Sequence, residues 1–142
     1  MVDEIAGLVP VSKQEVMILL EAGYQLMNMK RFDHAREVFG GAAALLPKSD
    51  VPHLALGTLE FALGHHAKAL QENRKAQQIA PESGLPRAHA GEALLFLGKA
   101  AEALKELSAA IEVEPNGGGA RLARALLEAH QSGALPPPSD GK

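Results

Sequence analysis

The sequence predicts an all-α protein, an α-solenoid of three 34-residue helix–turn–helix repeats followed by one capping helix. The main observation is a period, because one glycine, two alanines and one proline each recur every 34 residues in three copies. Composition favours the same class, since only 4% of the residues are aromatic while 46% are hydrophobic, so Ala and Leu must form most of the core. The four recurring sets are Gly23, Gly57 and Gly91; Ala35, Ala69 and Ala103; Ala42, Ala76 and Ala110; and Pro47, Pro81 and Pro115.

The glycines of the repeats have physical reasons. A glycine inside a helix costs about 1 kcal/mol relative to alanine, so three in register indicate close packing of two helices. We expect each of them to face the first recurring alanine of the second helix. Gly64 and Gly98 are placed to end the first helix of their repeats in a left-handed conformation. Lys30 occupies this position in the first repeat, which predicts a helix end that is strained or closed differently.

The repeats imply a definite layout. Ser12 and Glu15 have the spacing of a capping box at the start of the first helix. Asn73 occupies the large apolar position that Phe39 and Leu107 fill, so it should loosen that contact or find a polar partner. The expected helices span about 13–29, 32–46, 51–63, 66–80, 85–97, 100–113 and 119–131.

The predicted domain organisation is a single repeat domain over residues 13–131. An N-terminal extension, 1–12, precedes it, and a flexible Pro-rich tail, 132–142, follows it. Within the domain, the repeats cover about 16–49, 50–83 and 84–117, and the capping helix about 119–131.

Several functional classes are not expected. The net charge of −3 comes from interspersed acids and bases without a basic run, which argues against nucleic acid as a partner. No apolar run reaches the length of about 18 residues that a membrane span needs. The six histidines are scattered or lie in a turn, so we expect solvated or capping histidines and no metal site. No catalytic motif or cofactor motif is present, so we expect neither an enzyme nor a bound cofactor.

The period and the order of its residues resemble the tetratricopeptide repeat over about residues 16–115. The resemblance implies a concave groove lined by the first helix of each repeat. Eleven of the fifteen groove positions are aliphatic, Met or Phe here, and such an apolar surface normally marks a binding site. The alternative is that the chain's own N-terminus, its tail or a second copy covers this face. The groove positions fall on Met17, Leu20, Tyr24, Met27 and Asn28; on Val51, Leu54, Thr58, Phe61 and Ala62; and on Leu85, Ala88, Glu92, Leu95 and Phe96.

One known use of this repeat family is not expected. Some of its members hold the C-terminal carboxylate of heat-shock chaperones with Lys, Asn and Arg at fixed groove positions. The matching positions of this chain carry none of those residue types, so a heat-shock co-chaperone is disfavoured. These positions are Leu20, Tyr24, Ala55, Leu85 and His89.

Two segments resemble the class II chaperones of bacterial type III secretion more closely. They are HLALGTLEFALGHHAKAL, residues 53–70, and PRAHAGEALLFLGKAAEAL, residues 86–104. In that family the third repeat similarly opens with a proline, a His-Ala pair, an acidic residue between small residues, two leucines and a glycine. This chain differs where the family has a cysteine, Ala93, and where it often has an aromatic residue, His66. The matching residues are Pro86, His89, Ala90, Glu92, Leu94, Leu95 and Gly98.

The closer resemblance implies a bacterial cytoplasmic chaperone that holds translocator proteins before secretion, often as a homodimer formed through the N-terminal region. Such a protein needs an apolar groove for an extended segment, and it needs neither cofactor nor turnover. The competing interpretation is a non-chaperone scaffold or adaptor that uses the same groove to assemble another protein complex.

Overall fold

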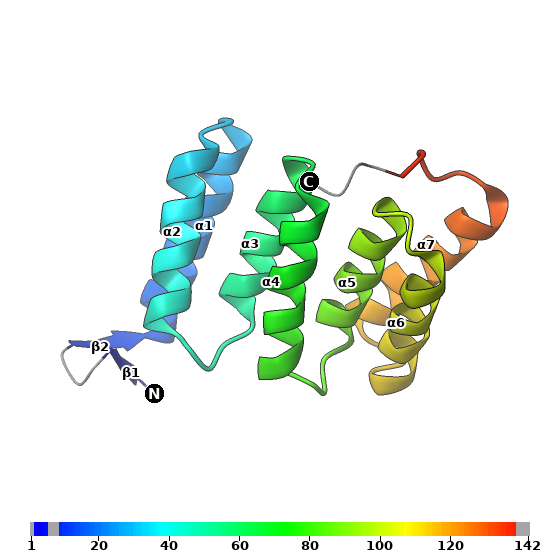
Figure 1. The fold of residues 1–142 in the computed structure, drawn as a ribbon. Helices are drawn as coiled ribbons and strands as arrows, with labels where there is room; N and C mark the ends of the chain where they lie inside the picture. The colour runs from blue at the N-terminus through cyan, green and yellow to red at the C-terminus, as the bar shows by residue number, and fades with distance from the viewer. Residues whose placement is uncertain (1, 6–8, 139–142) are drawn as a thin grey trace.

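The structure is a computed structural model, in which residues 2–5 and 9–138 are described. Helical hairpins stand side by side in one row, and α7 packs across the far end of the row (Figure 1). The predicted all-α solenoid with three repeats and a capping helix is confirmed, and each expected helix starts and ends within about two residues of its predicted bounds. The helices are α1 (Lys13–Asn28), α2 (Phe32–Leu45), α3 (Val51–Ala62), α4 (His66–Ile79), α5 (Gly84–Phe96), α6 (Ala100–Val113) and α7 (Gly118–Ser132).

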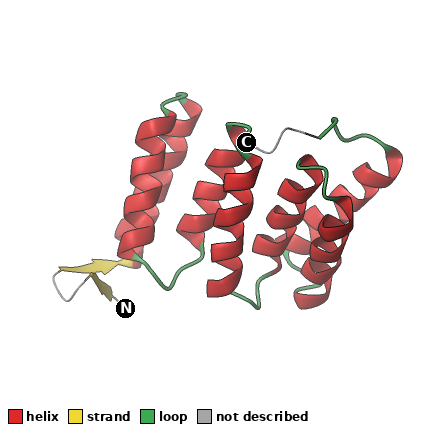
Figure 2. Cartoon of the chain, in the orientation of Figure 1, coloured by secondary structure: helices red, strands yellow, loops and turns green. Residues whose placement is uncertain are grey.

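A β-hairpin before α1 departs from the predicted fold class. Its strands, β1 (Val2–Ile5) and β2 (Val9–Ser12), pair antiparallel, with Val2 opposite Ser12 and Ile5 opposite Val9. The hairpin contacts α1 and α2, and Figure 2 shows its two strands at the N-terminal end of the row. From the sequence we expect only an extension here, because a single short pair of strands has no periodic signal.

The start of α1 has the predicted capping box. The Ser12 side chain accepts a hydrogen bond from the Glu15 amide at 3.2 Å, and the Glu15 carboxylate accepts one from the Ser12 amide at 2.9 Å. The backbone hydrogen bond from Ser12 is the main cause that lowers the pKa of Glu15. This reciprocal pair of hydrogen bonds fixes the residue at which the β-hairpin ends and the helix begins.

The first helix of every repeat ends in the same way. The amide of Arg31 donates to the Leu26 carbonyl at 2.8 Å, the six-to-one bond of a Schellman motif, and corresponding bonds form after α3 and α5. The left-handed residue of the motif has φ of 61° at Lys30, 79° at Gly64 and 78° at Gly98. Lys30 therefore keeps the standard closure and carries the strain of a side chain in the left-handed region, about 1 kcal/mol.

The helical glycines do lie at close helix crossings, but their partner differs from the predicted one. Gly91 was expected to face Ala103, whereas an added Cβ would lie 2.6 Å from Leu107 Cδ2 and 3.3 Å from the Ala103 carbonyl oxygen. Side chains on a helix lean toward its N-terminus, so the residue one turn further on covers the contact point. The facing pairs are Gly23 with Phe39, Gly57 with Asn73, and Gly91 with Leu107.

The apolar core consists of two clusters of buried side chains. One joins α1, α2 and α3 around Phe39 and Leu59, and the other joins α4, α5, α6 and α7 around Leu94 and Leu107. The two helices of the middle repeat therefore contribute their buried side chains to different clusters.

The end of the described chain closes the second cluster. At Gly119 an added Cβ would overlap the backbone of Gly84, so α7 approaches the start of α5 as closely as a backbone allows. Beyond α7, Leu135 packs against the second cluster, and Pro138 lies beside Gly98. The flexibility expected of the 132–142 tail stays a prediction, and residues 139–142 lie outside the described part of the chain.

Candidate functional site

The surface of interest is formed by the first helices of the repeats, α1, α3 and α5, and we call it the first-helix face. Neighbouring first helices contact one another along the row, α1 with α3 and α3 with α5. Several large apolar side chains on these helices are exposed, including Met17 (52%), Tyr24 (40%) and Val51 (42%). Met17 and Tyr24 are seven residues apart on α1, which places them on the same side of that helix.

The predicted groove residues differ in how accessible they are. Leu20, Ala88 and Leu95 are buried in the core clusters, so they support the first-helix face and are not open to a partner. The exposed ones are Met17, Tyr24, Asn28, Val51, Thr58 and Ala62. The half-buried ones are Met27, Leu54, Phe61, Leu85, Glu92 and Phe96.

Aromatic rings meet in the middle of this region. The rings of Phe61 and Phe96 stack edge to face, with their centroids 4.9 Å apart. The imidazole of His66 lies 4.8 Å from Phe61 and 5.1 Å from Phe96 between ring centroids, and His66 is only 8% exposed. The expectation of a solvated turn histidine is therefore wrong for His66. The sequence contained a sign of this burial, because the first repeat carries Phe32 at the equivalent position.

The burial of His66 affects its protonation. Desolvation lowers the pKa of His66, the nearby Glu92 carboxylate opposes this by favouring the charged ring, and His65 lowers the pKa further. The aromatic cluster of Phe61, His66 and Phe96 thus favours a neutral imidazole.

A small cavity lies next to this aromatic cluster, between the middle and third hairpins. Its volume is about 70 Å³, and side chains from α3, α4 and α5 line it. His89 Nδ1 and Glu92 Oε1 lie 3.2 Å apart at its wall. Thr58, Phe61 and Glu92 were predicted site residues, whereas Gly57, Asn73 and His89 were not. The lining residues are Gly57, Thr58, Phe61, Asn73, His89 and Glu92.

Asn73 is the most buried polar residue of this cavity, at 3% exposure. Its amide nitrogen donates to the Ala69 carbonyl one turn earlier, at 2.9 Å. Its Oδ1 has no hydrogen-bond partner and is closed to solvent. The sequence offered two outcomes for Asn73, a loosened contact or a polar partner, and the structure shows a partner for only half of the amide.

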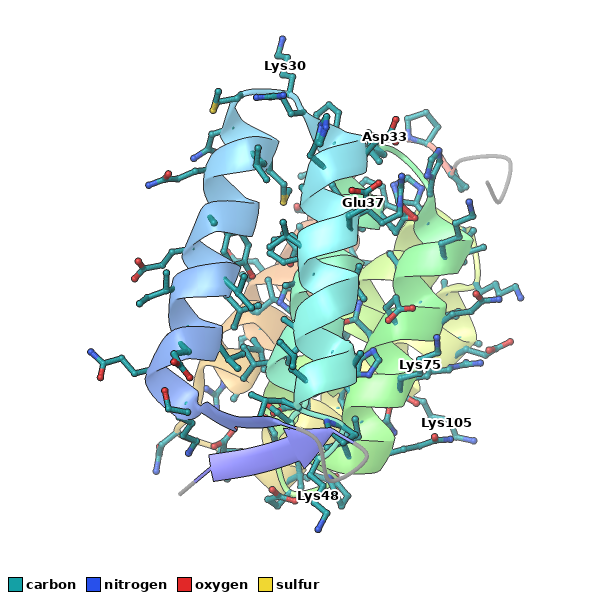
Figure 3. The ribbon with its side chains drawn as sticks, turned by 90° about the vertical axis from the view of Figure 1, so that its left-hand side faces the viewer. Lys30, Asp33, Glu37, Lys48, Lys75 and Lys105 are labelled. Atoms are coloured by element: carbon teal, nitrogen blue, oxygen red, sulfur yellow. The ribbon has the colours of Figure 1, made fainter. Side chains whose placement is uncertain are left out.

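The second helices present a different surface. Figure 3 shows Lys75 and Lys105 extending outward from α4 and α6, and both are exposed. Asp33 and Glu37, also labelled there, are exposed on α2. This surface is charged and solvated, whereas the exposed large apolar residues lie mainly on the first helices.

Two further findings concern the described residues. Within residues 2–5 and 9–138, no group of three or more His, Cys, Asp or Glu is arranged to hold a metal ion. None of the helices in that part of the chain combines the length and the hydrophobicity that a bilayer crossing requires.

Comparisons with known proteins establish the fold. No protein-family model and no curated protein sequence matches this chain. The translocator chaperone SycD of Yersinia enterocolitica type III secretion matches in structure with a TM-score of 0.74 and 24% identity, over 83% of this chain and 91% of SycD. PcrH of Pseudomonas aeruginosa matches with a TM-score of 0.73 and 24% identity, over 85% of this chain and 95% of PcrH.

A protein of another class shares the fold. The first tetratricopeptide-repeat domain of Spaghetti (RPAP3), solved with an HSP90 peptide, matches with a TM-score of 0.71 and 22% identity, over 88% of this chain and 98% of that domain. Because all these identities are low, the likenesses define a tetratricopeptide-repeat fold. Other matching structures show SycD with a peptide of the translocator YopD, and PcrH with the chaperone-binding regions of PopB and of PopD.

Proposed function

We propose that this protein is a chaperone of bacterial type III secretion, which holds an extended apolar segment of a translocator protein on its first-helix face. The observation that carries the proposal is the exposure of Met17, Tyr24 and Val51 on the first helices of a fold shared with SycD and PcrH. SycD has been solved with a peptide of the translocator YopD, and PcrH with the chaperone-binding regions of PopB and of PopD. Burial of exposed apolar side chains against such a segment supplies the binding free energy.

The proposal extends to how and where the protein works. It acts by binding alone, without catalysis, because holding a segment requires an apolar surface and no turnover. It works in the cytoplasm, where translocators are made before secretion. It forms a homodimer, which is supported by the dimer described for SycD.

The heat-shock alternative has little support in the site. The peptide bound to the Spaghetti domain comes from HSP90, but two of the five clamp positions of this chain, Leu20 and Ala55, are buried apolar residues. None of the five carries the lysine, arginine or asparagine of the carboxylate clamp.

The test is whether the chain keeps a translocator soluble. Co-expressed with a translocator protein from the same bacterium, the wild-type chain should retain it in the soluble fraction and co-purify with it. The double variant Met17→Glu, Val51→Glu should lose at least about tenfold in affinity, because binding would bury two unpaired carboxylates. Both positions are exposed, so the helix content measured by circular dichroism should not change.

A matched control places the same two charges elsewhere. Gln78→Glu and Ser108→Glu lie at exposed positions of α4 and α6, the second helices, and should leave binding intact. The proposal fails if the wild-type chain retains no translocator, or if the first-helix double variant and the control bind equally well. Failure with every translocator would favour the scaffold interpretation.

A further inference from the structure

The buried polar side chains of the described residues all belong to the middle hairpin. They are Glu60, His66 and Asn73, at 5%, 8% and 3% exposure. Glu60 has an ionic partner, since Arg36 Nη2 lies 2.7 Å from its Oε1. Asn73 differs, because its Oδ1 has neither a protein partner nor access to water. A buried acceptor without a donor destabilises the free protein, and a bound donor would remove that penalty.

The fold itself does not require an asparagine at this position. The same position carries Phe39 in the first repeat and Leu107 in the third, and both side chains are fully buried against the glycine of the crossing. At the middle crossing the Asn73 amide packs on Gly57, where an added Cβ would lie 2.8 Å from Nδ2 and 3.1 Å from Oδ1. The polar group is therefore an exception within an otherwise apolar set.

The cavity beside Asn73 is rich in hydrogen-bond acceptors. The Thr58 hydroxyl donates its proton to the Leu54 carbonyl at 3.0 Å, so only its lone pairs face a ligand. Glu92 contributes a carboxylate, whose Oε1 lies 3.2 Å from His89 Nδ1. Asn73 has already used its amide nitrogen and offers Oδ1. Phe61 supplies an aromatic wall.

We propose that this cavity is a subsite of the first-helix face that takes the ammonium group of a lysine in the bound segment. An ammonium carries three donors and no acceptor, which matches the acceptors of Asn73, Thr58 and Glu92. The cavity of about 70 Å³ suits a compact ammonium better than the broad planar guanidinium of arginine. Glu92 balances its charge, and the Phe61 ring packs on the lysine stem and attracts the cation.

Entry to the subsite requires one small movement. Oδ1 of Asn73 is closed to solvent in the free chain, so the side chains that line the cavity must shift slightly for the donor to reach it. The hydrogen bond to Oδ1 is thus formed only when the segment binds. The inference rests on the proposed function, because it defines which side chain of the held segment the face selects.

The first experiment tests the subsite without any translocator. The probe is n-butylammonium, the analogue of a lysine side chain, and pentan-1-ol of similar size is the uncharged control. In NMR titrations of the full chain, n-butylammonium should give saturable shifts of the Asn73 side-chain amide and the Thr58 amide, and pentan-1-ol should not. In Asn73→Leu, the shift of the Thr58 amide should be lost. Equal responses to both probes, or no saturable response, would overturn the subsite.

The second experiment measures binding and stability in the same variants. Asn73→Leu copies Leu107 of the third repeat, so it should raise the melting temperature by a few degrees. It should also lower the affinity for the translocator segment at least about tenfold, and so should Glu92→Gln. The lysine that enters the subsite can be replaced by norleucine in the segment. This replacement should lower the affinity of the wild-type protein for the segment and leave the affinity of Asn73→Leu unchanged.

The outcomes separate the two proposals. A translocator that binds with equal affinity to the wild type and to Asn73→Leu would leave the proposed function standing and overturn the lysine subsite. A selective n-butylammonium response in a chain that retains no translocator would support the ammonium subsite and contradict the proposed function.

Discussion

The middle and third hairpins share one backbone plan and differ in what they bury. Both close their first helix with a left-handed glycine, Gly64 or Gly98, at φ of 79° and 78°. The middle hairpin buries three polar side chains, whereas the third has apolar residues at the same positions. The matching pairs are Glu60 and Leu94, His66 and Ala100, and Asn73 and Leu107.

This difference shows which residues the fold depends on. The close crossing needs a glycine on one helix and a side chain of suitable volume on the other, and Asn73 and Leu107 are similar enough in volume to serve. Polarity at that position is not needed for the repeat geometry. The middle hairpin is therefore the part of the molecule where requirements other than folding are expected to act.

The largest expected effect comes from making the third hairpin resemble the middle one. Leu107→Asn should destabilise the protein by about 3 kcal/mol, because it removes a fully buried leucine from the second cluster and buries a polar amide. Urea unfolding followed by circular dichroism measures the loss. Equal stability of this variant and the wild type would show that the crossing tolerates an asparagine at either hairpin without cost.

A smaller effect is expected at Glu60, where the middle hairpin buries a carboxylate. Arg36→Met removes the cation 2.7 Å from Glu60 Oε1 and should cost about 2 kcal/mol. The usual cost of breaking a buried pair is higher, but Arg36 is 39% exposed. Adding Glu60→Leu, which copies Leu94, should restore most of the stability. If the double variant is no more stable than Arg36→Met, the Arg36–Glu60 pair stabilises the interface between α2 and α3 by packing as well as by charge.

The smallest effect concerns His66 and depends on pH. Burial lowers the pKa of His66 in the folded chain below its ordinary value of 6.5, so the unfolded chain binds a proton more readily. The stability linked to this group is fully present above pH 6.5 and is lost as the pH falls through the lowered pKa. His66→Phe, which copies Phe32 of the first repeat, should remove this contribution to the loss of stability at low pH. Unfolding curves of both proteins between pH 7.5 and about 5 provide the test, and parallel pH profiles would contradict it.

The repeat period explains why most of the fold could be predicted. A strict 34-residue spacing of glycines, alanines and prolines specifies each hairpin and its turn, so the helix bounds followed directly. The partner of the helical glycines was missed by one helical turn, because sequence spacing does not show how far a side chain leans along the helix. The strands β1 and β2 were missed because two four-residue segments lack any recurring pattern.

The candidate site was harder to predict for a different reason. The cavity forms between hairpins, where Asn73 of α4 meets His89 and Glu92 of α5. The period describes the inside of one repeat, and it says little about the offset between neighbouring repeats. Likewise, Leu20 and Leu95 are buried in clusters that include side chains of a neighbouring hairpin, from α3 for Leu20 and from α4 for Leu95, and the period does not describe those contacts.

The division of the apolar core between α3 and α4 has a mechanical consequence. The two clusters meet at the middle hairpin, where α3 packs closely on α4 and the crossing contains the Asn73 amide in place of the hydrocarbon of the neighbouring crossings. An amide contributes less apolar burial than a hydrocarbon side chain of similar volume, so we expect this crossing to open more readily than its neighbours. A segment that spans α1 to α5 would contact side chains of both clusters, so we expect its binding to make the opening of this crossing rarer.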